Sequence, residues 1–261
     1  MAFDYEEKIT ALLTKAEANG VTPEEAETFR QKAYDLMVKH SIDQAAIDAK
    51  RAKGESTQEE VVTDTIKFSG IYKDALVQFC HNITMSFKTM QGYVEKNIFL
   101  DWDDPREKHV KGHQYVIVGY ESDVRQVRVL LVSLQLQALA DLSEWWNTDE
   151  YASVIRTGGT PMQKFKTRRE FIMSFSTGAA AKIKERVARA MGEAGPGTEL
   201  ALRTRLDEVK AWLEAQRLGL KSTGRGMERG SYAATVAGQA AGRAANTGEA
   251  NIGPKRDAIG A

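Results

Sequence analysis

The sequence has almost no cysteine and no long apolar run. Because Cys80 is its only cysteine, an internal disulfide framework is excluded and a reducing compartment is favoured. We find no signal peptide and no run of about 18 apolar residues that could span a bilayer. Neither Gly-x-x-x-x-Gly-Lys-Ser/Thr nor a Gly-x-Ser-x-Gly elbow occurs, so nucleotide binding and a catalytic serine have no support. We therefore expect a cytosolic protein without membrane contact.

The chain also has no net charge, since its 261 residues include 36 basic and 36 acidic groups. The two parts of the chain nevertheless differ. Residues 1–160 hold 18 basic and 26 acidic groups, a net charge of −8, whereas residues 161–261 hold 18 basic and 10 acidic groups, a net charge of +8. This asymmetry favours an anionic partner at the C-terminal end, or self-association in which opposite ends meet. The alternative is that the two parts neutralise each other within the fold.

Residues 1–48 are typical of a helical hairpin module. Gly20 stands where a left-handed residue would end the first helix, and Thr22 with Glu25 forms a capping box for the second. Two helices joined by so short a loop pack antiparallel, but alone they bury too little surface to be stable. We expect the hairpin to dock on the rest of the chain or on a partner. The apolar stripe of its first helix comprises Ile9, Leu12, Leu13 and Ala16.

A central segment, residues 60–147, is expected to form an α+β core. Residue periodicity predicts, in order, a strand at 62–68, a helix at 71–88, strands at 92–99 and 114–120, and a helix at 122–146. The second of the two adjacent strands is apolar on both faces and should be central in its sheet. We expect Ser122 to cap the long helix. This helix is apolar on two sides, the second of which includes Val132, Leu136 and Leu139, and is therefore predicted to be central.

The C-terminal part is predicted to contain a helical region at 160–217 that packs on the core, with helices at 163–191 and 198–217. A Gly/Ala-rich basic tail follows at 218–261. Its small residues four apart, Ala234, Gly238 and Gly242, would let a helix approach another backbone closely; the alternative is a disordered tail. The predicted fold class is thus α+β: an N-terminal helical hairpin, a small sheet with helices in the order β-α-β-β-α, C-terminal helices and the tail.

The strongest candidate site is one face of the helix expected at 163–191. At 100° per residue its basic residues fall in a narrow arc that also contains two aromatic rings. Cations for phosphates and rings for base stacking are what single-stranded nucleic acid requires. The alternative is that a neighbouring element buries both rings while the basic groups are solvated. The candidate nucleic-acid-binding residues, with those of the tail, are Lys164, Arg168, Phe171, Phe175, Lys182, Arg186, Arg189, Arg225, Arg229 and Arg243.

Metal and cofactor sites have little support. In an extended segment His109 and His113 stand about 13 Å apart, too far to share one ion. The acidic segment 101–104 with Glu107 would suit hydrated Mg²⁺, but a solvated turn is the simpler interpretation. We predict no metal, no cofactor and no catalytic residue, and an enzyme acting through the 101–113 loop is the least supported class.

Three segments of the N-terminal hairpin carry a family resemblance: Lys-Ile-x-Ala-Leu-Leu-x-Lys-Ala-Glu at 8–17, Glu-Glu-Ala-Glu at 24–27 and Leu-Met-Val-Lys-His-Ser-Ile-Asp at 36–43. They resemble the module named domain of unknown function 2786, common in actinobacteria and their phages. Similar proteins continue with Gly-Tyr-Glu-Ser-Asp-Val, here 119–124, with Arg-Arg-x-Phe, here 168–171, and with an Ala/Gly-rich tail. The resemblance implies a phage or bacterial cytosolic origin and no established activity.

These observations lead to two functional hypotheses. The first is a phage-like nucleic-acid-associated accessory protein that binds DNA or RNA through the basic and aromatic helix, without catalysis. The alternative is a protein-interaction or assembly protein, with self-association or a host protein as partner and no nucleic-acid role. Oligonucleotide binding across a salt series and the oligomeric state would separate them.

Overall fold

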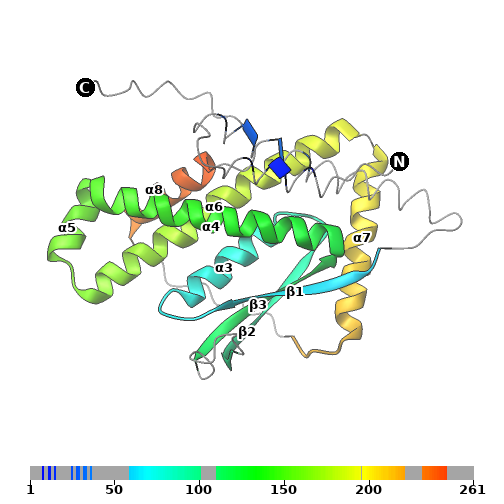
Figure 1. Cartoon of the computed structure of the whole chain (residues 1–261), viewed down its shortest axis with the longest axis horizontal. Helices are drawn as coiled ribbons and strands as arrows, with labels where there is room; N and C mark the ends of the chain where they lie inside the picture. The colour runs from blue at the N-terminus through cyan, green and yellow to red at the C-terminus, as the bar shows by residue number, and fades with distance from the viewer. Residues whose placement is uncertain are drawn as a thin grey trace, which may run out of the picture.

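A computed structural model of the chain describes residues 59–100, 110–194, 196–220 and 231–245, together with Lys8, Ala11, Leu12, Lys15, Glu25, Thr28, Phe29, Lys32, Ala33 and Leu36. The order of elements is β1 (Val61–Phe68), α3 (Lys73–Thr84), β2 (Gln91–Phe99), β3 (Lys111–Tyr120), α4 (Glu121–Thr148), α5 (Glu150–Gly158), α6 (Pro161–Ala194), α7 (Pro196–Ala215) and α8 (Tyr232–Ala244) (Figure 1). The predicted α+β class and the predicted β-α-β-β-α order of the core are confirmed.

The sheet has three antiparallel strands in the order β1-β3-β2. The predicted central position of β3 is confirmed, and the physical reason is that both of its faces are buried. Tyr115 and Ile117 point into the main core, whereas Val116 and Val118 point to the opposite face and pack with Val209 of α7. The period of two along one strand thus separates two apolar clusters.

Helices α3, α4 and α6 supply most of the main core on one face of the sheet. Figure 1 shows α4 running along the front of the molecule beside α6, with α5 joining them at one end. The break between α4 and α5 is set by Asp149, whose side chain accepts a hydrogen bond from Ala152 N–H (3.0 Å) and so caps α5. Sequence reasoning did not separate α5 as a helix of its own. None of the helices formed by the described residues is long and apolar enough to cross a membrane.

A close helix pair joins α8, which lies within the predicted tail, to α6. Ala234, Gly238 and Gly242 of α8 are buried. A Cβ atom on Gly238 or Gly242 would stand closer than 3.0 Å to backbone atoms of α6, so only glycine permits this approach. Small residues four apart therefore do bring two backbones together, and for residues 232–244 the disordered alternative is wrong. Residues 221–230 and 246–261 lie outside the described part of the chain.

The N-terminal segment contributes to the main core at a few described positions. Ala33 is fully buried, and Leu12 and Leu36 pack against the cluster formed by the sheet and helices. The described residues of this segment are helical. The turn and caps expected around Gly20 and Thr22 lie outside the described residues.

Candidate functional site

The basic and aromatic face predicted on α6 is an internal packing face. Phe171 is 1% exposed and stacks on Trp145, with ring centroids 5.2 Å apart; Phe175 is 0% exposed and stacks on Phe79 at 6.0 Å. Rings enclosed in this way offer no surface to a nucleobase. The prediction that these two residues bind nucleic acid by stacking is therefore corrected, because they form part of the main core.

The element that covers this face is α8, contributed by the chain's own C-terminal segment. The Gly242 contact is with the backbone of Phe175, and the Gly238 contact with that of Phe171. Basic groups on the same side serve the same helix pair: Lys182 Nζ donates to Ala245 O (2.8 Å), and Arg243 Nη1 lies 3.9 Å from a carboxylate oxygen of Glu185. The arc predicted from α6 alone is thus largely an intramolecular interface.

The other predicted basic residues are dispersed. Arg168 lies over the Trp146 ring at 4.4 Å, and Arg186 is buried. Lys164 is half-buried and Arg189 is exposed. Arg225 and Arg229 lie outside the described residues. Nucleic-acid binding stays a prediction, and its support is reduced to these scattered cations.

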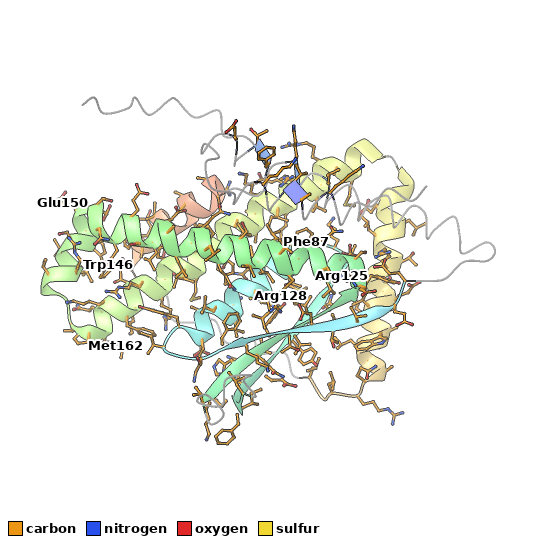
Figure 2. All side chains as sticks on the ribbon, in the orientation of Figure 1. Phe87, Arg125, Arg128, Trp146, Glu150 and Met162 are labelled. Atoms are coloured by element: carbon orange, nitrogen blue, oxygen red, sulfur yellow. The ribbon has the colours of Figure 1, made fainter. Side chains whose placement is uncertain are left out.

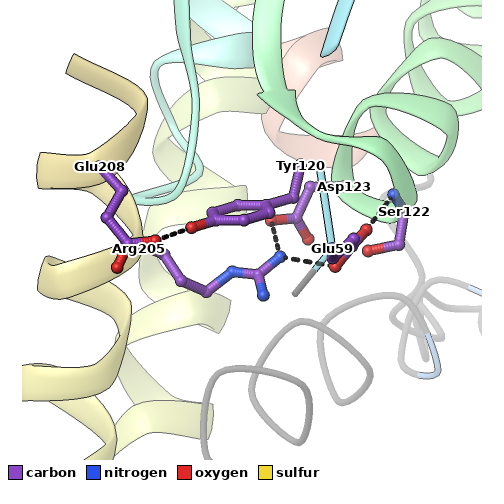
Figure 3. A network of polar contacts seen from close by, with 6 residues as sticks. All are labelled: Glu59, Tyr120, Ser122, Asp123, Arg205 and Glu208. Carbon is purple, nitrogen blue, oxygen red and sulfur yellow. Dashed lines mark hydrogen bonds and ion pairs between the residues drawn. The ribbon is translucent and has the colours of Figure 1, made fainter. Parts of the chain in front are cut away.

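A polar cluster that sequence reasoning did not find lies where β3 passes into α4 (Figure 3). Its centre is Arg205 of α7, whose side chain is 3% exposed. The Arg205 Nη2 atom donates to Glu59 Oε2 and to Asp123 Oδ2, each at 3.2 Å. The guanidinium also lies over the Tyr120 ring at 3.8 Å, and the Tyr120 hydroxyl donates to Glu208. One buried cation is thereby held by two carboxylates and one aromatic face.

The same cluster replaces the helix cap predicted from sequence. Helix α4 begins at Glu121, and its N-cap residue Tyr120 makes no side-chain cap hydrogen bond. Instead the Ser122 backbone N–H donates to Glu59 Oε1 (2.6 Å), so a carboxylate from before β1 satisfies the helix N-terminus. The prediction that Ser122 caps α4 is wrong, because an acceptor 63 residues earlier occupies that role.

The Arg205 cluster is suited to holding elements together. The Asp123 side chain is 0% exposed, so the ion pair is closed to solvent. It ties α7 to the start of α4 and to Glu59, two residues before β1. Only the Gly119–Val124 segment named in the family resemblance marked this region in the sequence. The partners Glu59 and Arg205 stand 146 residues apart, and no local pattern could have joined them.

The histidine considered for metal binding has protein partners on both ring nitrogens. His113 is buried; its Nδ1 lies 3.1 Å from the Asn97 backbone nitrogen and 2.9 Å from the Gly112 carbonyl oxygen, and its Nε2 lies 3.2 Å from Asp74 Oδ1. Among the described residues no group of three His, Cys, Asp or Glu side chains could hold a metal ion. Glu107, His109 and segment 101–104 lie outside these residues.

Cys80 is buried in the main core, where Gln135 Nε2 contacts its sulfur at 3.4 Å. Burial raises the pKa of the Cys80 thiol from its usual 9.0 to about 12. We expect iodoacetamide at pH 8 to label Cys80 only in urea, as measured by mass spectrometry. Rapid labelling of the native protein would contradict this prediction.

The same thiol should make stability depend on pH. Because the Cys80 thiol ionises only in the unfolded chain between pH 9 and 12, the free energy of unfolding should fall as pH rises above 9, and Cys80→Ala should reduce that decline.

An exposed apolar stripe on α4 is the second feature that differs from expectation. We define the α4 stripe as Val129, Val132, Leu136 and Leu139, which are 41–61% exposed. The prediction of a central helix covered on both sides is wrong: the side that carries Leu131 and Leu134 is buried, but the stripe faces outward. Figure 2 shows α4 on the front of the molecule, from Arg125 near the sheet to Trp146 near α5.

The fold defines an α+β protein in which helices cover a three-stranded antiparallel sheet and one long helix presents an apolar stripe. The family described as "Protein of unknown function (DUF2786)" matches residues 6–44, which confirms the resemblance for this N-terminal segment. No curated protein and no solved structure matches the chain.

Proposed function

We propose that this chain acts as a protein-interaction and assembly protein, and that the α4 stripe is its binding surface. The observation that supports the proposal is the stripe itself. Isolated exposed apolar side chains are ordinary on protein surfaces, but four at spacings of three and four form one continuous face. Leaving such a face in water is unfavourable, and covering it with an apolar helix of a partner would stabilise the assembly.

This proposal is preferred to nucleic-acid binding because of what each candidate face contacts. The face of α6 proposed for nucleic acid is covered by α8, and its rings belong to the core. The α4 stripe has the opposite property, since its side chains are exposed although their chemistry favours burial. Of the basic residues predicted on α6, Arg186 is buried and Arg168 lies over the buried Trp146 ring.

Site-specific photo-crosslinking tests the proposal. Benzoylphenylalanine placed at Leu136 in bacterial cells should give a protein adduct of one defined mass. The same residue at Leu200, which is exposed on α7, serves as the matched control and should give none. Adducts of equal yield at both positions, or none at Leu136, would contradict a binding role for the stripe.

The stripe should be dispensable for the fold of the single chain. Because Leu136 is exposed, Leu136→Glu should change the free energy of unfolding by only about 0.5 kcal/mol or less, as measured by urea denaturation. When combined with a photo-crosslinker at Val132, the same substitution should abolish the adduct. A large loss of stability would instead assign the stripe a role inside the chain.

A further inference from the structure

The α4 stripe leads toward a guanidinium group at its C-terminal end. Trp146 stands seven residues after Leu139, so it lies about 20° further round α4 and about 10 Å further along it. This tryptophan is 7% exposed, and the Arg168 guanidinium of α6 lies over its ring at 4.4 Å. Figure 2 shows Trp146 at the α5 end of α4, far from Arg125. The side of α4 that carries the stripe is therefore followed by a cation.

Arg168 has no acidic partner inside the part of the chain that the structure describes. Its side chain makes no hydrogen bond or ion pair with any of those residues, and its Nε atom is buried. The Lys164 side chain, four residues earlier and on the same side of α6, is likewise without a described partner. Cations four residues apart on a helix repel each other, so an anion that binds both would relieve this repulsion.

The cations at the other end of the stripe are neutralised within the chain. Arg125 forms an ion pair with Glu121, four residues earlier on α4, and Arg128 forms one with Asp64 of β1. The two ends of the stripe therefore differ in charge. A ligand with an anionic group is attracted to the end beside α6.

Acidic side chains of α4 do not neutralise the end of the stripe beside α6. Asp141 and Glu144 lie about 140° and 160° from Trp146 around the helix, so they are directed away from the Arg168 guanidinium. A ligand that covers the stripe and reaches this end therefore needs two properties. It must offer an apolar surface to the stripe and an anionic group to the guanidinium.

We propose that the α4 stripe binds an amphipathic helix of a partner protein, and that this helix carries one or more Asp or Glu side chains where it meets Arg168 and Lys164. The inference rests on the proposed function and states the chemistry of the partner. The apolar side of the helix covers the stripe, and its carboxylates accept hydrogen bonds from a guanidinium that Trp146 holds in place. A nucleic-acid backbone would supply the anion but not the apolar surface.

Charge reversal combined with photo-crosslinking tests the proposal in bacterial cells. With benzoylphenylalanine at Leu136, Lys164→Glu and Arg168→Glu should each lower the adduct yield about tenfold or more, because a repulsive contact replaces an attractive one. Arg168→Lys keeps the charge and should keep most of the yield. Arg203→Glu, at an exposed position of α7, is the matched control and should leave the yield unchanged.

Lys164→Glu separates an effect on binding from an effect on folding. Arg168→Glu also removes the group that lies over Trp146, whereas the Lys164 side chain makes no contact of this kind with a described residue. We expect the urea unfolding curve of Lys164→Glu to match that of the wild-type protein.

Mass spectrometry of the adduct identifies the partner segment. It should place an Asp or Glu about ten residues from the cross-linked position, the distance from Leu136 to Trp146 along α4. Replacing that acidic residue of the partner with Lys should restore the adduct yield of the Arg168→Glu chain.

Every other outcome overturns the proposal. Unchanged yields in both charge-reversal variants would show that no acidic group of the partner meets Arg168, while the adduct itself would still support the proposed function. A cross-link to nucleic acid, or to a second copy of this chain, would identify a different occupant. Absence of any adduct at Leu136 in the parent chain would overturn both this inference and the proposed function.

Discussion

A valine in place of Gly178 should separate α8 from α6 and lower the free energy of unfolding by about 3 kcal/mol. Gly178 is buried in α6, and a Cβ atom there would stand closer than 3.0 Å to the backbone at Gln239 and Arg243 of α8. Backbone cannot move aside as a flexible side chain can, so the two helices must part. Their separation would expose core rings such as Phe175, and that loss of buried apolar surface adds to the strain.

The matched control is Gly192→Val in the same helix. Nothing lies within 4 Å of the position that its Cβ would take, so the exchange should change stability by less than about 1 kcal/mol. Urea denaturation followed by circular dichroism would measure both variants, and limited proteolysis would show whether α8 becomes accessible in the first. Equal losses in the two variants would contradict the close helix pair.

The Arg205→Met substitution should lower the free energy of unfolding by a similar amount, about 3–5 kcal/mol. The methionine has a similar length but leaves the fully buried Asp123 carboxylate beside Glu59 without their shared cation. It also removes the guanidinium from the Tyr120 ring. The junction between α7 and the start of α4 is therefore expected to open first, which hydrogen exchange at residues 120–124 would detect.

Arg203→Met is the control on the same helix. Arg203 is exposed and lies 4.0 Å from Asp207, a surface pair worth less than about 1 kcal/mol. A double-mutant cycle with Asp123→Asn then isolates the interaction energy of the Arg205–Asp123 ion pair. In the double variant Asp123→Asn removes the carboxylate charge that Arg205→Met leaves unpaired. If Arg205→Met and Arg203→Met have equal unfolding midpoints, the cluster does not hold α7 in place.

Predictions that depend on local periodicity were confirmed. Apolar residues on both faces of β3 indicated its central position in the sheet. The spacing of apolar residues located the ends of α3, α4, α6 and α7 to within a few residues. The spacing of Ala234, Gly238 and Gly242 also indicated a close backbone approach. Each of these signals arises from the geometry of one strand or one helix, and neighbours along the chain are enough to generate it.

Predictions that depend on which element covers a face were wrong. The arc that contains Phe171 and Phe175 has the composition of a nucleic-acid surface, yet α8 covers it from some 65 residues further along the chain. The second apolar side of α4 has the composition of a buried face, yet Leu136 is exposed. The Glu59 carboxylate caps α4 across 63 residues, and nothing near Ser122 in the sequence indicates it.

The sequence by itself determined the elements of this protein: their order, their approximate ends and their apolar sides. It also determined the family resemblance of the N-terminal segment, since that match depends on residue identity alone. The tertiary structure decided which apolar side is core and which is surface, and which charges are paired. The physical reason is that burial and ion pairing depend on atoms brought close by the whole fold, whereas periodicity describes one element at a time.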